Sequence, residues 1–136
     1  MNAPQPETLQ SQLVTVARLD TVDTFIAERA KFKGDFEADP THSAGIKIDG
    51  SLEGSIVIPS GGVVHIGPTG RVSGTAIEAD YVYIEGFCDS KITGRLGVEV
   101  TGSATVRGAI DYQGSYNQHN GAKVRGNISY TGPEEA

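Results

Sequence analysis

Apolar and polar positions follow one short phrase that recurs six times along the 136-residue chain. The phrase is a small residue, any residue, an apolar residue, any residue, a glycine (serine in the fourth copy), any residue and a second, mostly apolar residue. Its fifth position falls at residues 34, 54, 74, 90, 108 and 126, so the intervals are 20, 20, 16, 18 and 18 residues. A repeat of about eighteen residues is typical of a solenoid, in which each repeat forms one coil and stacks on the next.

A second apolar element recurs between the phrases, with two aliphatic residues separated by one variable residue. Alternation with a period of two predicts strands that bury one face. Glycine and short polar residues separate these strands, as turns with positive φ require. The element reads Ile46-x-Ile48, Val64-x-Ile66, Val82-x-Ile84 and Val98-x-Val100.

Stacking of the coils places equivalent apolar residues in columns that face a common axis. Three columns are predicted: Phe32, Leu52, Val72, Cys88, Val106 and Val124; Phe36, Ile56, Ala76, Ile92, Ile110 and Ile128; and Ile48, Ile66, Ile84 and Val100, which Gln118 interrupts. The intervening residues are mostly polar and are expected to face water. They include Lys47, His65, Tyr83 and Glu99.

The predicted fold is all-β, a single-stranded β-helix (β-solenoid) of about six coils over residues 23–131. Residues 1–22 are expected to form a flexible N-terminal tail, and residues 132–136 a flexible C-terminal tail. Residues 1–12 are rich in proline, glutamine, serine and glutamate, which favours disorder. Leu9, Leu13, Val14, Val16, Ala17 and Leu19 leave open a short amphipathic anchor for a membrane or a partner.

The two ends of such a rod expose apolar side chains and backbone edges, which solenoids normally cover with a polar cap. No capping helix is expected after Gly126. Uncapped ends predict end-to-end assembly. At the N-terminal end the expected contact residues are Phe25, Ile26, Phe32 and Phe36.

Composition narrows the function further. The net charge is −6 and no run of five basic residues occurs, which argues against nucleic-acid binding and weakens attraction to anionic lipid. The single cysteine, Cys88, excludes an internal disulfide and fits a reducing compartment. No apolar run reaches the ~20 residues of a membrane-spanning helix, and the first residues lack the features of a signal peptide. A cytoplasmic protein is expected.

An enzymatic interpretation stays open because eighteen is three times six. Left-handed β-helix acyltransferases and related carbonic-anhydrase-like trimers wind on hexapeptides, but here the aliphatic hexad holds for only one coil. His65 and His119 lie 54 residues apart, about 14 Å along the rod, which is too far to share one zinc ion. The third histidine, His42, is expected in a surface loop. No catalytic, cofactor-binding or metal site is predicted.

The six phrases, the polar N-terminal tail and the closing segment 121–130 (Gly-Ala-Lys-Val-Arg-Gly-Asn-Ile-Ser-Tyr) together resemble the bactofilins, over roughly residues 24–130. Bactofilins are bacterial polymer-forming cytoskeletal proteins. The resemblance implies a right-handed β-helix of triangular cross-section, a hand that periodicity alone does not decide. It also implies nucleotide-free filaments built through the end coils, which organise cell-envelope or peptidoglycan-remodelling proteins and cell shape.

The sequence departs from the family pattern in two respects. Many bactofilins begin with a hydrophobic or basic membrane-targeting stretch, which residues 1–7 do not resemble, so attachment to the inner face of the cytoplasmic membrane stays open. The family often has phenylalanine in the last coil, where this chain has Val124, Ile128 and Tyr130. These three residues are expected to form the C-terminal contact.

The predicted function is a non-enzymatic scaffold that polymerises with itself and needs no cofactor. The alternatives are the hexapeptide-type trimer and a monomeric β-solenoid adaptor bound to one partner.

Overall fold

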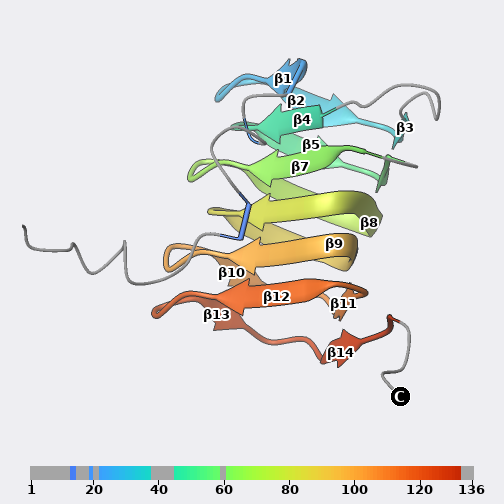
Figure 1. Ribbon diagram of the computed structural model, residues 1–136. Coiled ribbons are helices and arrows are strands. Elements are labelled where there is room, and N and C mark those ends of the chain that lie inside the picture. The colour runs from blue at the N-terminus through green and yellow to red at the C-terminus, as the bar shows by residue number, and fades with distance from the viewer. Residues whose placement is uncertain (1–12, 15–18, 20–21, 38–44, 59–60, 133–136) are drawn as a thin grey trace, which may run out of the picture.

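The computed structural model describes residues 13–14, 19, 22–37, 45–58 and 61–132. The elements in this part are strands that pair in parallel and stack from β1 at the top of Figure 1 to β14 at the bottom. Their bounds are β1 Thr24–Ile26, β2 Lys31–Lys33, β3 Phe36–Glu37, β4 Gly45–Ile48, β5 Ser51–Glu53, β6 Ile56–Val57, β7 Val63–Ile66, β8 Arg71–Ile84, β9 Phe87–Val100, β10 Thr105–Val106, β11 Ile110–Tyr112, β12 Ser115–Gln118, β13 Lys123–Val124 and β14 Ile128–Tyr130.

The strands lie on three faces of a rod, and β8 and β9 are long because each bends across all three. Face 1 contains β1, β4, β7, the last parts of β8 and β9, and β12. Face 2 contains β2, β5, the first parts of β8 and β9, β10 and β13. Face 3 contains β3, β6, the middle parts of β8 and β9, β11 and β14.

Each face is six strands deep within the described residues, so the chain completes five turns and most of a sixth. We number the coils 1 to 6, each beginning with its strand on face 1. The helix is right-handed, as parallel crossovers favour (Figure 1). The prediction of an all-β, single-stranded β-helix of about six coils is therefore confirmed, and the left-handed alternative is wrong.

The predicted apolar columns form the core, with one correction. The column from Phe32 to Val124 is paired residue by residue as expected. In the second column Ile77, not Ala76, pairs with Ile56 and Ile92 and is fully buried. Coil 3 holds one extra residue after Gly74, and this bulge shifts the register so that Ala76 pairs with Lys91.

The corners between faces 2 and 3 are closely stacked, which explains the glycine in the phrase. Gly54 has a φ of 148°, and a Cβ there would overlap the carbonyl oxygen of Gly34 in the coil before. A Cβ on Gly74 would overlap Gly54 in the same way. Ser90 takes this place in coil 4, where its buried hydroxyl has no hydrogen-bond partner.

Two positions of face 1 that were expected to face water are buried instead. Glu99 is fully buried, and His65 is only 9% exposed. His65 lies edge-on to the ring of Tyr83, at 5.1 Å between ring centroids, and its Nε2 is 2.7 Å from Glu85 Oε1. The expectation of outward, solvated side chains is therefore wrong for Glu99 and His65, because further groups pack on the outside of the sheet.

One of these groups comes from the predicted N-terminal tail. Val14 is fully buried, and its backbone N–H donates a 2.8 Å hydrogen bond to Glu99 Oε1. Leu13 packs at Gly97, where an added Cβ would lie 2.9 Å from its side chain. Leu13 and Val14 therefore pack on the rod and do not form a tail without contacts. For residues 1–12, 15–18 and 20–21 the tail prediction lies outside the described residues.

Candidate polymerisation surfaces

Within the described residues, coil 1 leaves the N-terminal end of the core open. The side chains there surround a hollow of about 160 Å³, lined by Thr24, Phe25, Ile26, Phe32, Phe36 and Ile46. The ring of Phe32 is 39% exposed although its equivalents in coils 2 to 5 are fully buried. The structure therefore brings together the four residues predicted for this end, around one apolar depression.

Phe25 differs from its neighbours in direction. It pairs with Lys47 in the outward column of face 1 and is 66% exposed, whereas Ile26 pairs with Ile48 in the core. Phe25 thus borders the hollow from the outside of the rod. Phe32 and Phe36 head the core columns of faces 2 and 3.

Coil 6 leaves the C-terminal end open in the same manner. Ile128 is 41% exposed and Tyr130 is 47% exposed, and Val124 is half-buried. All three pair on one side with coil 5, through Val106, Ile110 and Tyr112. Within the described residues the opposite edges of β12, β13 and β14 have no strand partner. Such edges present unpaired backbone groups to a further strand.

Two tyrosines that sequence reasoning missed extend the C-terminal end. The rings of Tyr112 and Tyr130 lie 5.5 Å apart, and Tyr116 stacks on Tyr112 at 5.5 Å. Burial, with a smaller contribution from Tyr112, raises the pKa of Tyr116 to about 12. The eighteen-residue spacing from Tyr112 to Tyr130 was the signal that could have identified this aromatic pair.

On face 1 the polar side chains of Glu99, Asn117 and His119 contact one another. Glu99 Oε2 lies 2.6 Å from His119 Nε2 and accepts a 3.0 Å hydrogen bond from Asn117 Nδ2. Burial, then the charges of Glu85 and Glu99, raises the pKa of Tyr83 to about 12.

Among the described residues these contacts do not bring the ligands of a metal ion together. The part of the chain that the structure describes holds no group of three or more His, Cys, Asp and Glu side chains that could bind a metal ion. His65 and His119 are each engaged by a different glutamate. His42 lies outside the described residues. The thiol of Cys88 is buried in the core, and burial raises its pKa to about 12.

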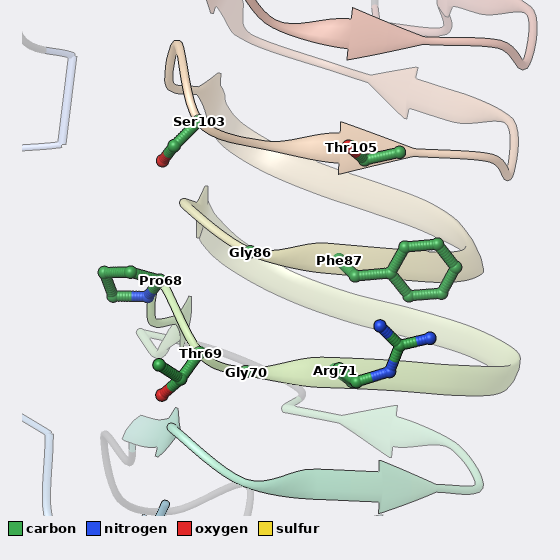
Figure 2. A pocket seen from close by; sticks show the side chains of 8 residues that line it. All are labelled: Pro68, Thr69, Gly70, Arg71, Gly86, Phe87, Ser103 and Thr105. Carbon is green, nitrogen blue, oxygen red and sulfur yellow. The ribbon is translucent and has the colours of Figure 1, made fainter.

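An open hollow of about 360 Å³ lies on face 2 and the adjoining corner (Figure 2). The hydroxyls of Thr69 and Ser103 at this corner donate to the backbone oxygens of Asp49 and Glu85. Farther along, the guanidinium of Arg71 lies 4.4 Å from the ring centroid of Phe87. The lining residues come from three successive coils and are Pro68, Thr69, Gly70, Arg71, Gly86, Phe87, Ser103 and Thr105.

In the described part of the chain, no helix has the length and the apolar character needed to span a bilayer.

The comparisons with known proteins agree with one another. A family model described as "Bactofilin: Polymer-forming cytoskeletal" matches residues 24–129. A similar solved structure is the cryo-EM reconstruction of Thermus thermophilus bactofilin double helical filaments, with 27% sequence identity and a TM-score of 0.66. The match covers 79% of this chain and 99% of that chain. No curated protein matches the sequence.

Proposed function

The chain belongs to the bactofilin family of polymer-forming cytoskeletal proteins, and we propose that it polymerises end to end through coils 1 and 6. The observation that carries this proposal is the open core at both ends of the rod. Phe32 at one end and Ile128 at the other are about two-fifths exposed, whereas the inner members of their columns are fully buried. A further coil on either end would remove these surfaces from water.

The columns define how such a contact can form. In a head-to-tail stack, Val124 would rest on Phe32 and Ile128 on Phe36, which continues the columns of faces 2 and 3. In a like-to-like stack, each open end would meet its own copy. Burial of one large apolar side chain contributes about 1.5–3 kcal/mol, and either stack buries several at once. The filaments of the related Thermus thermophilus chain support self-assembly of this kind.

We include independence from nucleotide in the proposal. The repeated glycines form packed corners, and the backbone N–H groups of the first two are already bonded. Gly34 donates to Glu53 O and Gly54 donates to Ser73 O, both at 2.9 Å. A phosphate-binding loop needs such N–H groups to point at the ligand. The polymer is proposed to act as a non-enzymatic cytoplasmic scaffold for cell-envelope or peptidoglycan-remodelling proteins, which rests on the family resemblance.

The test is negative-stain electron microscopy of the purified full chain, dialysed against chelator and free of nucleotide. Filaments that form under these conditions and do not change on addition of ATP or GTP are the expected result. Discrete trimers, or filaments that appear only with nucleotide, would contradict the proposal. Sedimentation of the same samples gives an independent measure of the polymerised fraction.

A further inference from the structure

Face 2 gathers positive charge that is scattered along the sequence. Six of the chain's 11 lysine and arginine residues are exposed on its outer surface, and only two carboxylates, Glu53 and Asp89, lie among them. The net charge of this surface is therefore +4, on a chain whose net charge is −6. The six are Lys31, Lys33, Arg71, Arg107, Lys123 and Arg125.

Face 3 has the opposite sign. Its outer surface carries four carboxylates and one lysine, a net charge of −3. The acidic residues are Asp35, Glu37, Glu78 and Asp111, and the lysine is Lys91. The Lys91 ammonium of coil 4 lies 3.4 Å from the Asp111 carboxylate of coil 5, so these two residues form an ion pair between neighbouring coils.

The two charge patterns are complementary in coils 1, 3, 4 and 5, whereas in coils 2 and 6 face 3 carries no charge. In coil 3 face 2 presents Arg71 and face 3 presents Glu78. In coil 5 the corresponding residues are Arg107 and Asp111. Coil 1 repeats the pattern with two lysines on face 2 and two carboxylates on face 3.

Coil 4 inverts the sign on both faces. There face 2 presents Asp89 and face 3 presents Lys91. A uniformly anionic surface such as a lipid bilayer would match the cations of face 2 but would repel Glu53 and Asp89. A partner that carries the charges of face 3 is complementary in coils 1, 3, 4 and 5, and it sets no like charge against face 2 in coils 2 and 6.

From this complementarity we propose that face 2 of one subunit binds face 3 of a second copy of this chain, side by side and pointing in the same direction. An antiparallel pairing would set coil 3 against coil 4, with Arg71 opposite Lys91 and Asp89 opposite Glu78. Like charges opposed in this way repel, whereas complementary charges fix the register of an interface. The charge signs thus select the parallel arrangement with equal coils level.

The surface of face 2 is already organised for such a contact. The guanidinium groups of Arg71 and Arg107 lie 4.4 Å and 5.6 Å from the centroid of the Phe87 ring between them. Figure 2 shows Arg71 beside Phe87 on the outer surface of the sheet. Cation–π contacts of this kind restrict both side chains before a partner arrives.

The lateral contact extends the proposed end-to-end polymer. Because face 2 and face 3 are different surfaces, the contact is heterologous, and each pair keeps one free face 2 and one free face 3 to which further subunits can bind. Single exposed ion pairs are weak, but a filament repeats them many times and gains avidity. The expected product is pairs or larger bundles of aligned filaments.

The experiment uses two charge-reversed full-length variants. The face 2 variant is Arg71→Glu with Arg107→Glu, and the face 3 variant is Glu78→Lys with Asp111→Lys. By electron microscopy, each alone is expected to give single filaments. A one-to-one mixture is expected to restore lateral pairing, because each reversed face then meets an opposite charge. Wild-type pairs are expected to separate in 1 M NaCl, where the Debye length is about 3 Å, while the filaments persist.

The matched control is Arg29→Glu with Lys47→Glu, which changes the net charge equally but lies outside faces 2 and 3. It is expected to keep lateral pairing. Pairing that survives both face variants, or that the mixture does not restore, would overturn the proposal. So would a face 2 variant that keeps pairing but no longer binds phosphatidylglycerol vesicles, since face 2 would then be a lipid surface. If the end-to-end contact fails and no filaments form, salt-dependent side-by-side oligomers in sedimentation decide the lateral contact separately, and their absence overturns it.

Discussion

Glu99 accepts a 2.8 Å hydrogen bond from the backbone N–H of Val14, a residue 85 positions earlier in the chain. The contact turns an outward position of β9 into a fully buried one. It also attaches the segment before coil 1 to the outside of coil 5. Because His119 and Asn117 approach the other carboxylate oxygen, Glu99 joins three parts of the chain at one point.

Removal of this carboxylate should therefore destabilise the fold. In Glu99→Ala the N–H of Val14 and the Nδ2 of Asn117 lose the carboxylate as an acceptor, and an unsatisfied buried donor costs about 1–3 kcal/mol. We expect the free energy of unfolding, measured by urea titration, to fall by about that amount. Hydrogen exchange at the Val14 amide should become faster at the same time.

Glu53→Ala is the matched control for this prediction. The exposed Glu53 makes one weak ion pair, with 4.0 Å between its Oε1 and Lys33 Nζ. Its removal should therefore change the free energy of unfolding by less than about 0.5 kcal/mol. Equal effects of the two substitutions would mean that the Val14 contact does not form in solution. Both measurements need a background that does not polymerise, because assembly stabilises the folded subunit by mass action.

Ile128→Arg should provide that background. The side chain is 41% exposed at the open end of the face 3 column, and a charge placed there would have to be buried in a stacked filament. We expect filaments to be lost while the circular dichroism spectrum stays that of a β-rich protein. Tyr130→Arg should act in the same direction. Ser129→Arg is the control, because Ser129 points outward from the same strand and pairs with Asp111.

The products of Ile128→Arg also report how the ends meet. If the polymer is head-to-tail, loss of the C-terminal contact leaves monomers. If like ends pair, dimers joined through coil 1 remain. Analytical ultracentrifugation distinguishes the two masses, and unchanged filaments would remove the C-terminal surface from the proposal.

The apolar columns could be read from the sequence because their members recur at nearly constant intervals. Where two apolar residues stood side by side, as Ala76 and Ile77 do, the repeat alone could not choose between them. The burial of Glu99 could not be predicted from the sequence because it depends on Val14. Alternation within a strand carries no information on a segment 85 residues away. The basic surface of face 2 was missed for a similar reason, since its cations are spread over four of the six coils and form no basic run.

The corner glycines give a further test of stacking at the N-terminal end. Gly34 and Gly54 both have positive φ, so alanine strains the backbone at each by about 1–3 kcal/mol. At Gly54 the added Cβ also overlaps the carbonyl of Gly34, whereas at Gly34 it meets the Phe32 ring at 3.7 Å, because coil 1 is the first coil of the described residues. Gly54→Ala should therefore be about 1–3 kcal/mol more destabilising than Gly34→Ala in urea titration.

Gly34→Ala should have a larger effect on filament assembly than on the stability of the single subunit. If another subunit stacks on coil 1, its corner occupies the space that the new Cβ enters. We expect Gly34→Ala to fold and yet to sediment as a shorter polymer than the wild type. Full-length filaments of Gly34→Ala would indicate that the N-terminal end is not covered by a stacked coil.

Cys88 offers a prediction on pH. Burial raises the pKa of its thiol from 9.0 to about 12. A backbone hydrogen bond from Ser90 lowers this pKa, and the charge of Asp89 raises it by a smaller amount. Above pH 9 the unfolded chain loses this proton while the folded chain keeps it, so the free energy of unfolding should fall as pH rises from 9 towards 12. Tyr83 and Tyr116, raised from 10.0 to about 12, add to the fall above pH 10.

Urea titrations of wild type and Cys88→Val at pH 8, 9.5 and 10.5 separate the thiol from the tyrosines. Valine fits the column, since Val72 and Val106 flank Cys88 above and below. The variant should lose stability with pH less steeply than the wild type throughout the range from pH 9 towards 12, because only the tyrosines contribute to its fall. The thiolate is the reactive form, so at pH 8 the folded protein should react with a maleimide at least about a thousandfold more slowly than the unfolded chain. Rapid labelling of the folded protein would show that the column opens at coil 4, where Ser90 already leaves a buried hydroxyl unpaired.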